Sequence, residues 1–124
     1  PEDVANEIAL NKKNNKVLIY TYSLSPFSTE AIRLLNDLGY EFTKIELGAE
    51  WFLLGGKESE TRVALSREVD NGATSLPKIF IGEECIGGYS ELAALVESGE
   101  IDTLMKKAKV PNKNAPAKKS FSLW

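Results

Sequence analysis

The side chains best placed for chemistry in this chain are two serines, Ser25 and Ser28, with Pro26 and Phe27 between them. They follow the apolar, β-branched run 17–21 and precede apolar residues at helical spacing, which predicts a strand-to-helix turn. A serine at a helix start accepts hydrogen bonds from first-turn amides, and proline suits the first helical position. A hydroxyl becomes a nucleophile only with the help of a base, and the chain has no histidine to act as one. On its own, Ser25 therefore reads most simply as a helix cap.

The numbers of cysteine, histidine and charged residues argue against several kinds of site and partner. Cys85 is the one cysteine of 124 residues, so no internal disulfide can form, which argues against a secreted, disulfide-stapled domain. Because the chain has no histidine, it lacks the usual nitrogen ligand of zinc and the usual base of a catalytic triad. A net charge of −3 gives no electrostatic case for nucleic acid or an anionic membrane. We expect an intracellular monomer, in the cytoplasm or an organelle interior, that binds no metal, nucleic acid or membrane.

The apolar and turn patterns predict the elements that position this turn. Helices are expected over 2–11, 25–38, 57–70, 90–98 and 101–109, and strands over 17–21, 40–47, 78–81 and 85–86. A strand–helix–strand unit pairs its strands in parallel, and a following hairpin adds an antiparallel pair. The order βαβ–α–ββ–α thus predicts an α/β fold with a four-stranded mixed sheet flanked by helices. We expect an N-terminal helix and linker over 1–15, one domain over 16–109, and a flexible tail over 110–124.

Three separated motifs resemble the glutaredoxin family of the thioredoxin superfamily over about residues 16–108. They are Ser25-Pro26-Phe27-Ser28, then Thr74-Ser75-Leu76-Pro77 before the third strand, then Gly87-Gly88-Tyr89-Ser90-Glu91-Leu92 at a helix start. The resemblance implies a thioredoxin-like fold. It also implies glutathione-dependent thiol–disulfide redox chemistry, because the family carries Cys-Pro-(Tyr/Phe)-Cys, or a variant ending in serine, at the first motif.

The resemblance assigns a role to each motif. The family's first cysteine is a thiolate at a helix start, which attacks a glutathione mixed disulfide and is regenerated by a second glutathione. The proline matching Pro77 is cis and sets the backbone matching Leu76 beside the ligand, while amides after Gly88 receive a ligand carboxylate. No covalent cofactor is implied; the implied ligand is glutathione, or a peptide or protein partner in the same groove. The implied site comprises the catalytic positions Ser25 and Ser28 and a groove formed by Tyr22, Pro26, Phe27, Ser75, Leu76, Pro77, Gly87, Gly88, Tyr89 and Ser90.

The chain departs from the family pattern at the catalytic positions. Serine at 25 and 28 cannot run the dithiol or the monothiol cycle, so the sequence as it stands predicts no catalysis. Tyr22 stands where a lysine is usual, and Ser90 where an aspartate is frequent. Two interpretations remain open: a natural member that lost catalysis and kept its groove for binding or regulation, or an active disulfide oxidoreductase with both cysteines exchanged for serine. The changes at Tyr22 and Ser90 favour natural divergence. Iron–sulfur carriage needs a thiolate at position 25 and is disfavoured.

Two further features have alternative interpretations. Cys85 lies in a predicted hairpin strand, where a packing role competes with a redox or intermolecular disulfide role. The run 51–54, Trp-Phe-Leu-Leu, covers the core or, if exposed, forms an interaction patch.

Overall fold

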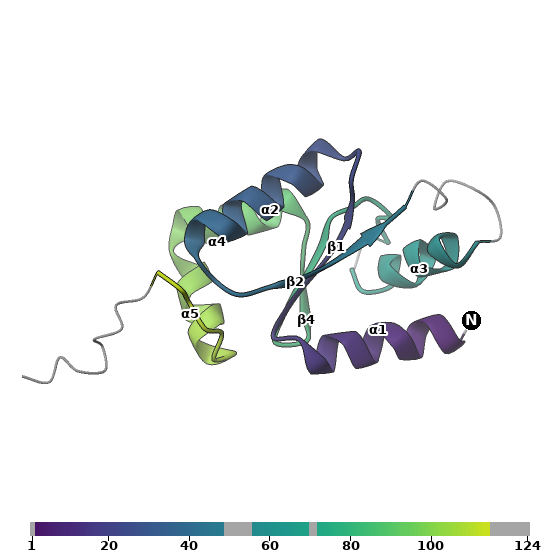
Figure 1. Cartoon of the computed structure of the whole chain (residues 1–124), viewed down its shortest axis with the longest axis horizontal. Coiled ribbons are helices and arrows are strands. Elements are labelled where there is room, and N and C mark those ends of the chain that lie inside the picture. The colour runs from purple at the N-terminus through teal and green to yellow at the C-terminus, as the bar shows by residue number, and fades with distance from the viewer. Residues whose placement is uncertain (1, 49–55, 70–71, 115–124) are drawn as a thin grey trace, which may run out of the picture.

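The computed structural model describes residues 2–48, 56–69 and 72–114. The predicted order βαβ–α–ββ–α, preceded by an N-terminal helix, is confirmed (Figure 1). In chain order the elements are α1 (Glu2–Asn14), β1 (Val17–Tyr22), α2 (Pro26–Leu38), β2 (Thr43–Leu47), α3 (Lys57–Ser66), β3 (Lys78–Ile81), β4 (Glu84–Gly87), α4 (Tyr89–Ser98) and α5 (Glu100–Lys107).

The strands form a mixed sheet in the order β2-β1-β3-β4. β1 pairs in parallel with β2, as the α2 crossover requires, and antiparallel with β3, where Ile19 lies opposite Ile79. β3 and β4 form the predicted antiparallel hairpin, with a register shift between Ile79 and Phe80. The expected α/β fold with a four-stranded mixed sheet is therefore confirmed.

Strand alternation divides the core into two clusters, one on each face of the sheet. On one face, helices α1 and α3 cover residues such as Leu18 and Phe80. On the other face, α2, α4 and α5 cover Ile19 and Ile79 (Figure 1). All four of these strand side chains are fully buried. The sheet is thus packed on both sides, which fixes the strand ends from which the site turns emerge.

Several element boundaries differ from the prediction. α1 continues to Asn14, three residues past the predicted end at residue 11. Tertiary contacts hold this last turn, because Lys12 Nζ lies 5.4 Å from the centre of the Phe80 ring and 3.1 Å from Glu68 Oε1. α3 ends at Ser66 rather than residue 70. The positions of such helix ends depend on tertiary packing, which local helix propensity does not determine.

The chain after α5 is attached to the turn that follows α2. Lys113 N–H donates to the Gly39 carbonyl at 2.9 Å, and Glu41 N–H donates to the Pro111 carbonyl at 3.0 Å. Tyr40 forms an isolated bridge with Asn112, and β2 begins at Thr43 rather than at the predicted residue 40. The predicted flexible tail begins at residue 110, whereas the chain is attached to the domain through residue 113.

The run 51–54 lies outside the described residues, as do 115–124, so both interpretations of that apolar run stay predictions. Among the helices that are described, none has the length and apolar character needed to cross a membrane.

Candidate functional site

The first wall of the candidate site is the turn between β1 and α2. Ser25 is the N-cap of α2 in extended backbone conformation, and its Oγ accepts a hydrogen bond from Ser28 N–H at 3.2 Å. The same hydroxyl donates to the Leu76 carbonyl at 3.4 Å, and Pro26 occupies the first turn of the helix. The predicted cap role of Ser25 is confirmed. Its oxygen lies at the positive end of the helix dipole, where an anionic group would be stabilised.

Ser28 has a different environment from Ser25. Its side chain is 1% exposed, and its Oγ accepts a hydrogen bond from Tyr22 N–H at 3.1 Å. This bond joins the first turn of α2 to the last residue of β1. Ser28 therefore holds the turn that carries Ser25 and does not itself face the solvent.

We expect Ser28→Ala to lower the free energy of unfolding by about 1–3 kcal/mol, because the buried Tyr22 N–H would lose its partner. Denaturant unfolding measures the change. The exposed Ser23, in the same turn, is the matched control, and Ser23→Ala should fall within about 0.5 kcal/mol of the parent. Equal effects of the two substitutions would show that the Ser28 hydrogen bond contributes nothing.

The second wall is the segment that leads into β3. The Leu76–Pro77 peptide bond is cis, as the family resemblance implies. Both residues are buried, and the Leu76 carbonyl accepts from the Ser25 hydroxyl. The segment before β3 and the start of α2 are therefore in direct contact, although about fifty residues separate them in sequence.

The third wall is the start of α4. Gly88 is its N-cap, and a Cβ at this position would lie 3.1 Å from the Pro77 carbonyl oxygen, so glycine permits the close approach of the two walls. Glu91 Oε1 accepts from Gly88 N–H at 2.8 Å, and this bond holds the pKa of the Glu91 carboxyl below its usual value. The Tyr89 ring lies with its centre 6.3 Å from that of Phe27, which connects this wall to the first.

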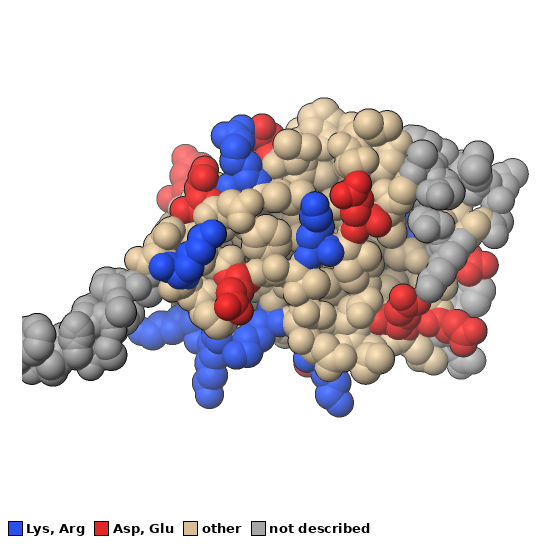
Figure 2. All heavy atoms as spheres, viewed as in Figure 1, with Lys and Arg blue, Asp and Glu red and all other residues tan. Residues whose placement is uncertain are grey.

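The three walls enclose a cavity of about 300 Å³. Figure 2 shows that the surface over the start of α2 consists of uncharged residues on the face in view. Phe27, which lines the cavity, is 61% exposed, and Leu24, in the turn before α2, is 74% exposed. The residues that line the cavity are Phe27, Val69, Ala73, Ser75, Leu76, Pro77, Lys78, Gly87, Gly88, Tyr89, Ser90 and Glu91.

Most of the predicted groove residues line this cavity, but Tyr22 and Pro26 do not, and the catalytic positions Ser25 and Ser28 lie beside it rather than in its lining. Tyr22 is 6% exposed and belongs to the core cluster beneath α1 and α3, and Pro26 is exposed outside the cavity. Sequence reasoning missed four lining residues, which are Val69, Ala73, Lys78 and Glu91. Glu91 has a recognisable signal, since an acid at the third position of a helix caps its own N-terminus. Lys78 has none, because it looks like the first residue of an ordinary strand.

A larger cavity, of about 580 Å³, lies at the other end of β1, beneath residues 110–113. It is lined by residues from 14–17, 39–43 and the attached segment after α5, and it contains none of the predicted site residues. The smaller cavity is the candidate site, because three separate segments converge on it. They are the start of α2, the backbone before β3 and the start of α4.

Cys85 lies on β4, outside the cavity lining. It is half-buried and packs against the core cluster that contains Phe80. Burial raises the pKa of the Cys85 thiol, which disfavours the reactive thiolate. These surroundings favour the packing interpretation over a redox role.

Comparisons with known proteins point to one family. The chain is 37% identical over 90 residues to a probable glutaredoxin of Synechocystis sp., which covers 73% of this chain and 92% of that protein. It is 34% identical over 89 residues to a glutaredoxin of Pseudomonas aeruginosa, covering 72% and 94% respectively. No protein-family model matches the chain.

Solved structures of glutaredoxins have the same fold. Oxidized glutaredoxin 2 from Chlamydomonas reinhardtii superposes with a TM-score of 0.74 at 26% identity, over 87% of this chain and 95% of that one. A buckwheat glutaredoxin–glutathione complex superposes with a TM-score of 0.76 at 17% identity, over 87% and 92%. With two curated relatives above 30% identity and matched over nearly their full length, this chain belongs to the glutaredoxin family.

Proposed function

We propose that this glutaredoxin-family protein binds glutathione without covalent chemistry, in the cavity between α2, the segment before β3 and the start of α4, and serves a binding or regulatory role. The observation that carries the proposal is the hydrogen-bonding of Ser25. Its Oγ occupies the helix start beside the cavity, accepts from Ser28 N–H and donates to the Leu76 carbonyl. These two hydrogen bonds support the proposal, because they join the start of α2 to the segment before β3 without a thiol at position 25.

The chemistry of the site supports the absence of catalysis. A hydroxyl ionises far less readily than a thiol, and the helix dipole is worth only about 1 kcal/mol at a surface site. No histidine exists in the chain to act as a base. Ser25 also cannot form a disulfide. The glutathione ligand is supported by the fold shared with the buckwheat glutaredoxin–glutathione complex.

A second candidate function is that of an active glutathione-dependent disulfide oxidoreductase in which both cysteines have been exchanged. It is favoured by the position of Ser25 at the N-cap, which is where a thiolate would be stabilised. The unmodified coding sequence separates the two. Cysteine codons at positions 25 and 28 would establish the enzyme, and serine codons would exclude the exchange.

The glutathione proposal predicts that calorimetry detects binding of reduced glutathione at millimolar concentration. Tyr89→Ala should weaken that binding about fivefold, because an aromatic contact is worth about 1 kcal/mol. Leu10→Ala is the control, since Leu10 is exposed on α1, away from the cavity. If the parent chain gives no binding heat at millimolar glutathione, the cavity is not a glutathione site and its ligand is a peptide or protein.

A further inference from the structure

β2 is an edge strand with an open outer side. In the sheet order β2-β1-β3-β4 it pairs only with β1 among the residues that the structure describes. Figure 1 shows β2 crossing the face in view, with no labelled helix in front of it. Its outward backbone N–H and C=O groups are therefore accessible to another strand, as at any unpaired sheet edge.

The side chains of β2 alternate between the two faces of the sheet. Ile45 and Leu47 belong to the cluster beneath α1 and α3, where Leu47 is buried and Ile45 is half-buried. Lys44 lies opposite Ile19 on the other face, where the side chains of Lys44 and Glu46 are 46% and 42% exposed. Lys44 Nζ lies 3.7 Å from Glu46 Oε1. The strand therefore carries one half-buried apolar side chain between two exposed, unlike charges.

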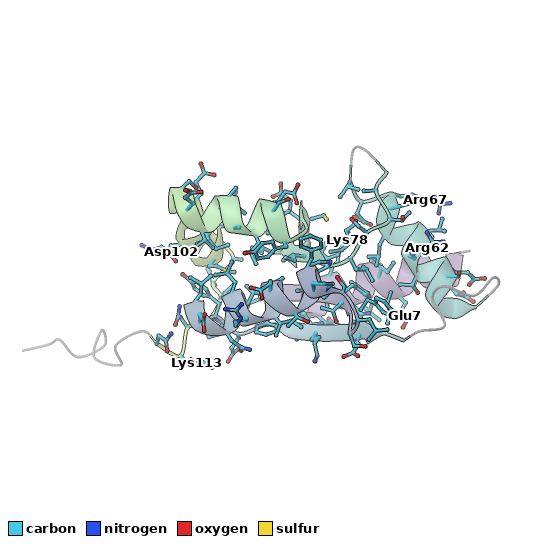
Figure 3. All side chains as sticks on the ribbon, turned by 90° about the horizontal axis from the view of Figure 1, so that it is seen from above. Glu7, Arg62, Arg67, Lys78, Asp102 and Lys113 are labelled. Carbon is cyan, nitrogen blue, oxygen red and sulfur yellow. The ribbon has the colours of Figure 1, made fainter. Side chains whose placement is uncertain are left out.

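A small cavity adjoins this edge. Its volume is about 180 Å³, and its lining includes Ile45 and Leu47 of β2 and Val4 and Ile8 of α1. Glu7 of α1, labelled in Figure 3, borders the same cavity. Apolar surface at Ile45 is thus still accessible beside the open edge, where a second strand would bury it.

Antiparallel pairing of β2 with a second copy of itself has one favourable register. When the two strands are centred on Ile45, two-fold symmetry sets Lys44 opposite Glu46 of the second copy, and the reverse. Centring the pair on Lys44 or on Glu46 sets like charges opposite each other, which destabilises a sheet. A shift of one residue would bring side chains of opposite faces together. Charged side chains commonly keep sheet edges apart, whereas the order Lys-Ile-Glu is complementary to itself.

We propose that β2 pairs in this register with β2 of a second copy, so that the two four-stranded sheets form one continuous sheet in a dimer. Backbone hydrogen bonds hold the strands together, Ile45 packs on Ile45 of the second copy, and the unlike charge pairs fix the register. A monomer is expected from the sequence, because an open edge is visible only once the strand order is known. The dimer does not depend on the proposed function, since β2 lies outside the lining of the candidate cavity.

Sedimentation equilibrium of the full chain at concentrations up to about 1 mM tests the dimer, because small interfaces associate weakly. The mean mass of the parent should rise with concentration toward that of two chains. Lys44→Glu and Glu46→Lys should each weaken the association about tenfold, because each turns two unlike pairs into like pairs. The double variant should associate as the parent does, and so should Lys106→Glu, on the exposed surface of α5.

Mixtures of variants test the register. An equimolar mixture of Lys44→Glu chains and Glu46→Lys chains should associate at least as strongly as the parent, because every charge pair between the copies is then unlike. The parent and the double variant, labelled with different fluorophores at their N-termini, should each pair with themselves and not with each other. This comparison also decides the question if a single variant does not fold, because the double variant keeps an unlike pair within its own strand.

Three results would overturn the inference. The first is a parent chain whose mass stays that of one chain at every concentration, which leaves the proposed glutathione binding intact. The second is association that neither single substitution weakens, because the copies then meet through another surface. The third is equal pairing of the parent with itself and with the double variant, because the charges of β2 then have no part in the contact.

Discussion

Ser25→Cys is expected to give the chain a reactive thiol that forms a mixed disulfide with glutathione. The new sulfur would lie at the N-cap of α2, where Ser28 N–H and the helix dipole stabilise a thiolate and hold the thiol pKa well below its ordinary value. The thiolate attacks one sulfur of glutathione disulfide, the disulfide bond breaks, and a glutathione thiolate leaves. Intact mass should show one added glutathionyl group.

The pH dependence of alkylation measures the activation of this thiol directly. At pH 6, Ser25→Cys should react with iodoacetamide about tenfold faster than free glutathione, because its larger thiolate fraction outweighs the lower nucleophilicity of a more acidic thiol. The parent chain is the control for Cys85, whose pKa burial raises. Ser28→Cys should also react slowly, since position 28 is buried. A Ser25→Cys rate no higher than that of the parent would show that the helix start does not activate a thiol.

Leu35→Ala is expected to lower the free energy of unfolding by about 2–5 kcal/mol, because it leaves a cavity in a fully packed region. Leu35 is 0% exposed on the buried face of α2, in the cluster with Ile19 and Leu92. α2 carries Ser25 at its start, so its packing also fixes the site. Denaturant unfolding followed by circular dichroism measures the change.

The matched control for this substitution is Leu10→Ala, on the exposed side of α1 at 58% exposure. Its effect should fall within about 0.5 kcal/mol. A loss below about 1 kcal/mol for Leu35→Ala would contradict the burial of α2 against the sheet, since a buried Leu→Ala substitution costs about 2 kcal/mol or more.

The elements around the site could be predicted because each has a local signal. The β-branched run 17–21, the Ser25-Pro26 helix start and Gly39, which ends α2 with φ +88°, all act within a few residues of their own position. Boundaries that depend on distant contacts could not be predicted in this way. The last turn of α1 is held by Phe80 and Glu68, and the segment after α5 is held by the turn at Gly39.

The site itself was predicted in part. The three motifs that carry the family resemblance supply most of the cavity walls. Tyr22 is an exception, because its position at the end of β1 places its side chain in the core. Its backbone N–H donates a hydrogen bond to the Ser28 Oγ. Lys78 could not be found from sequence, since the orientation of a first strand residue depends on the register of β3 against β1.

The proposed function depends on the binding of glutathione in a cavity that has serine at the two catalytic positions. Amide chemical-shift mapping of the full chain with reduced glutathione tests it most directly. We expect saturable shifts at millimolar ligand, largest at Leu76, Gly88 and Tyr89, with little change at Lys16 and Lys113 beside the larger cavity. Shifts that centre on Lys16 and Lys113, or no shifts at all, would contradict it.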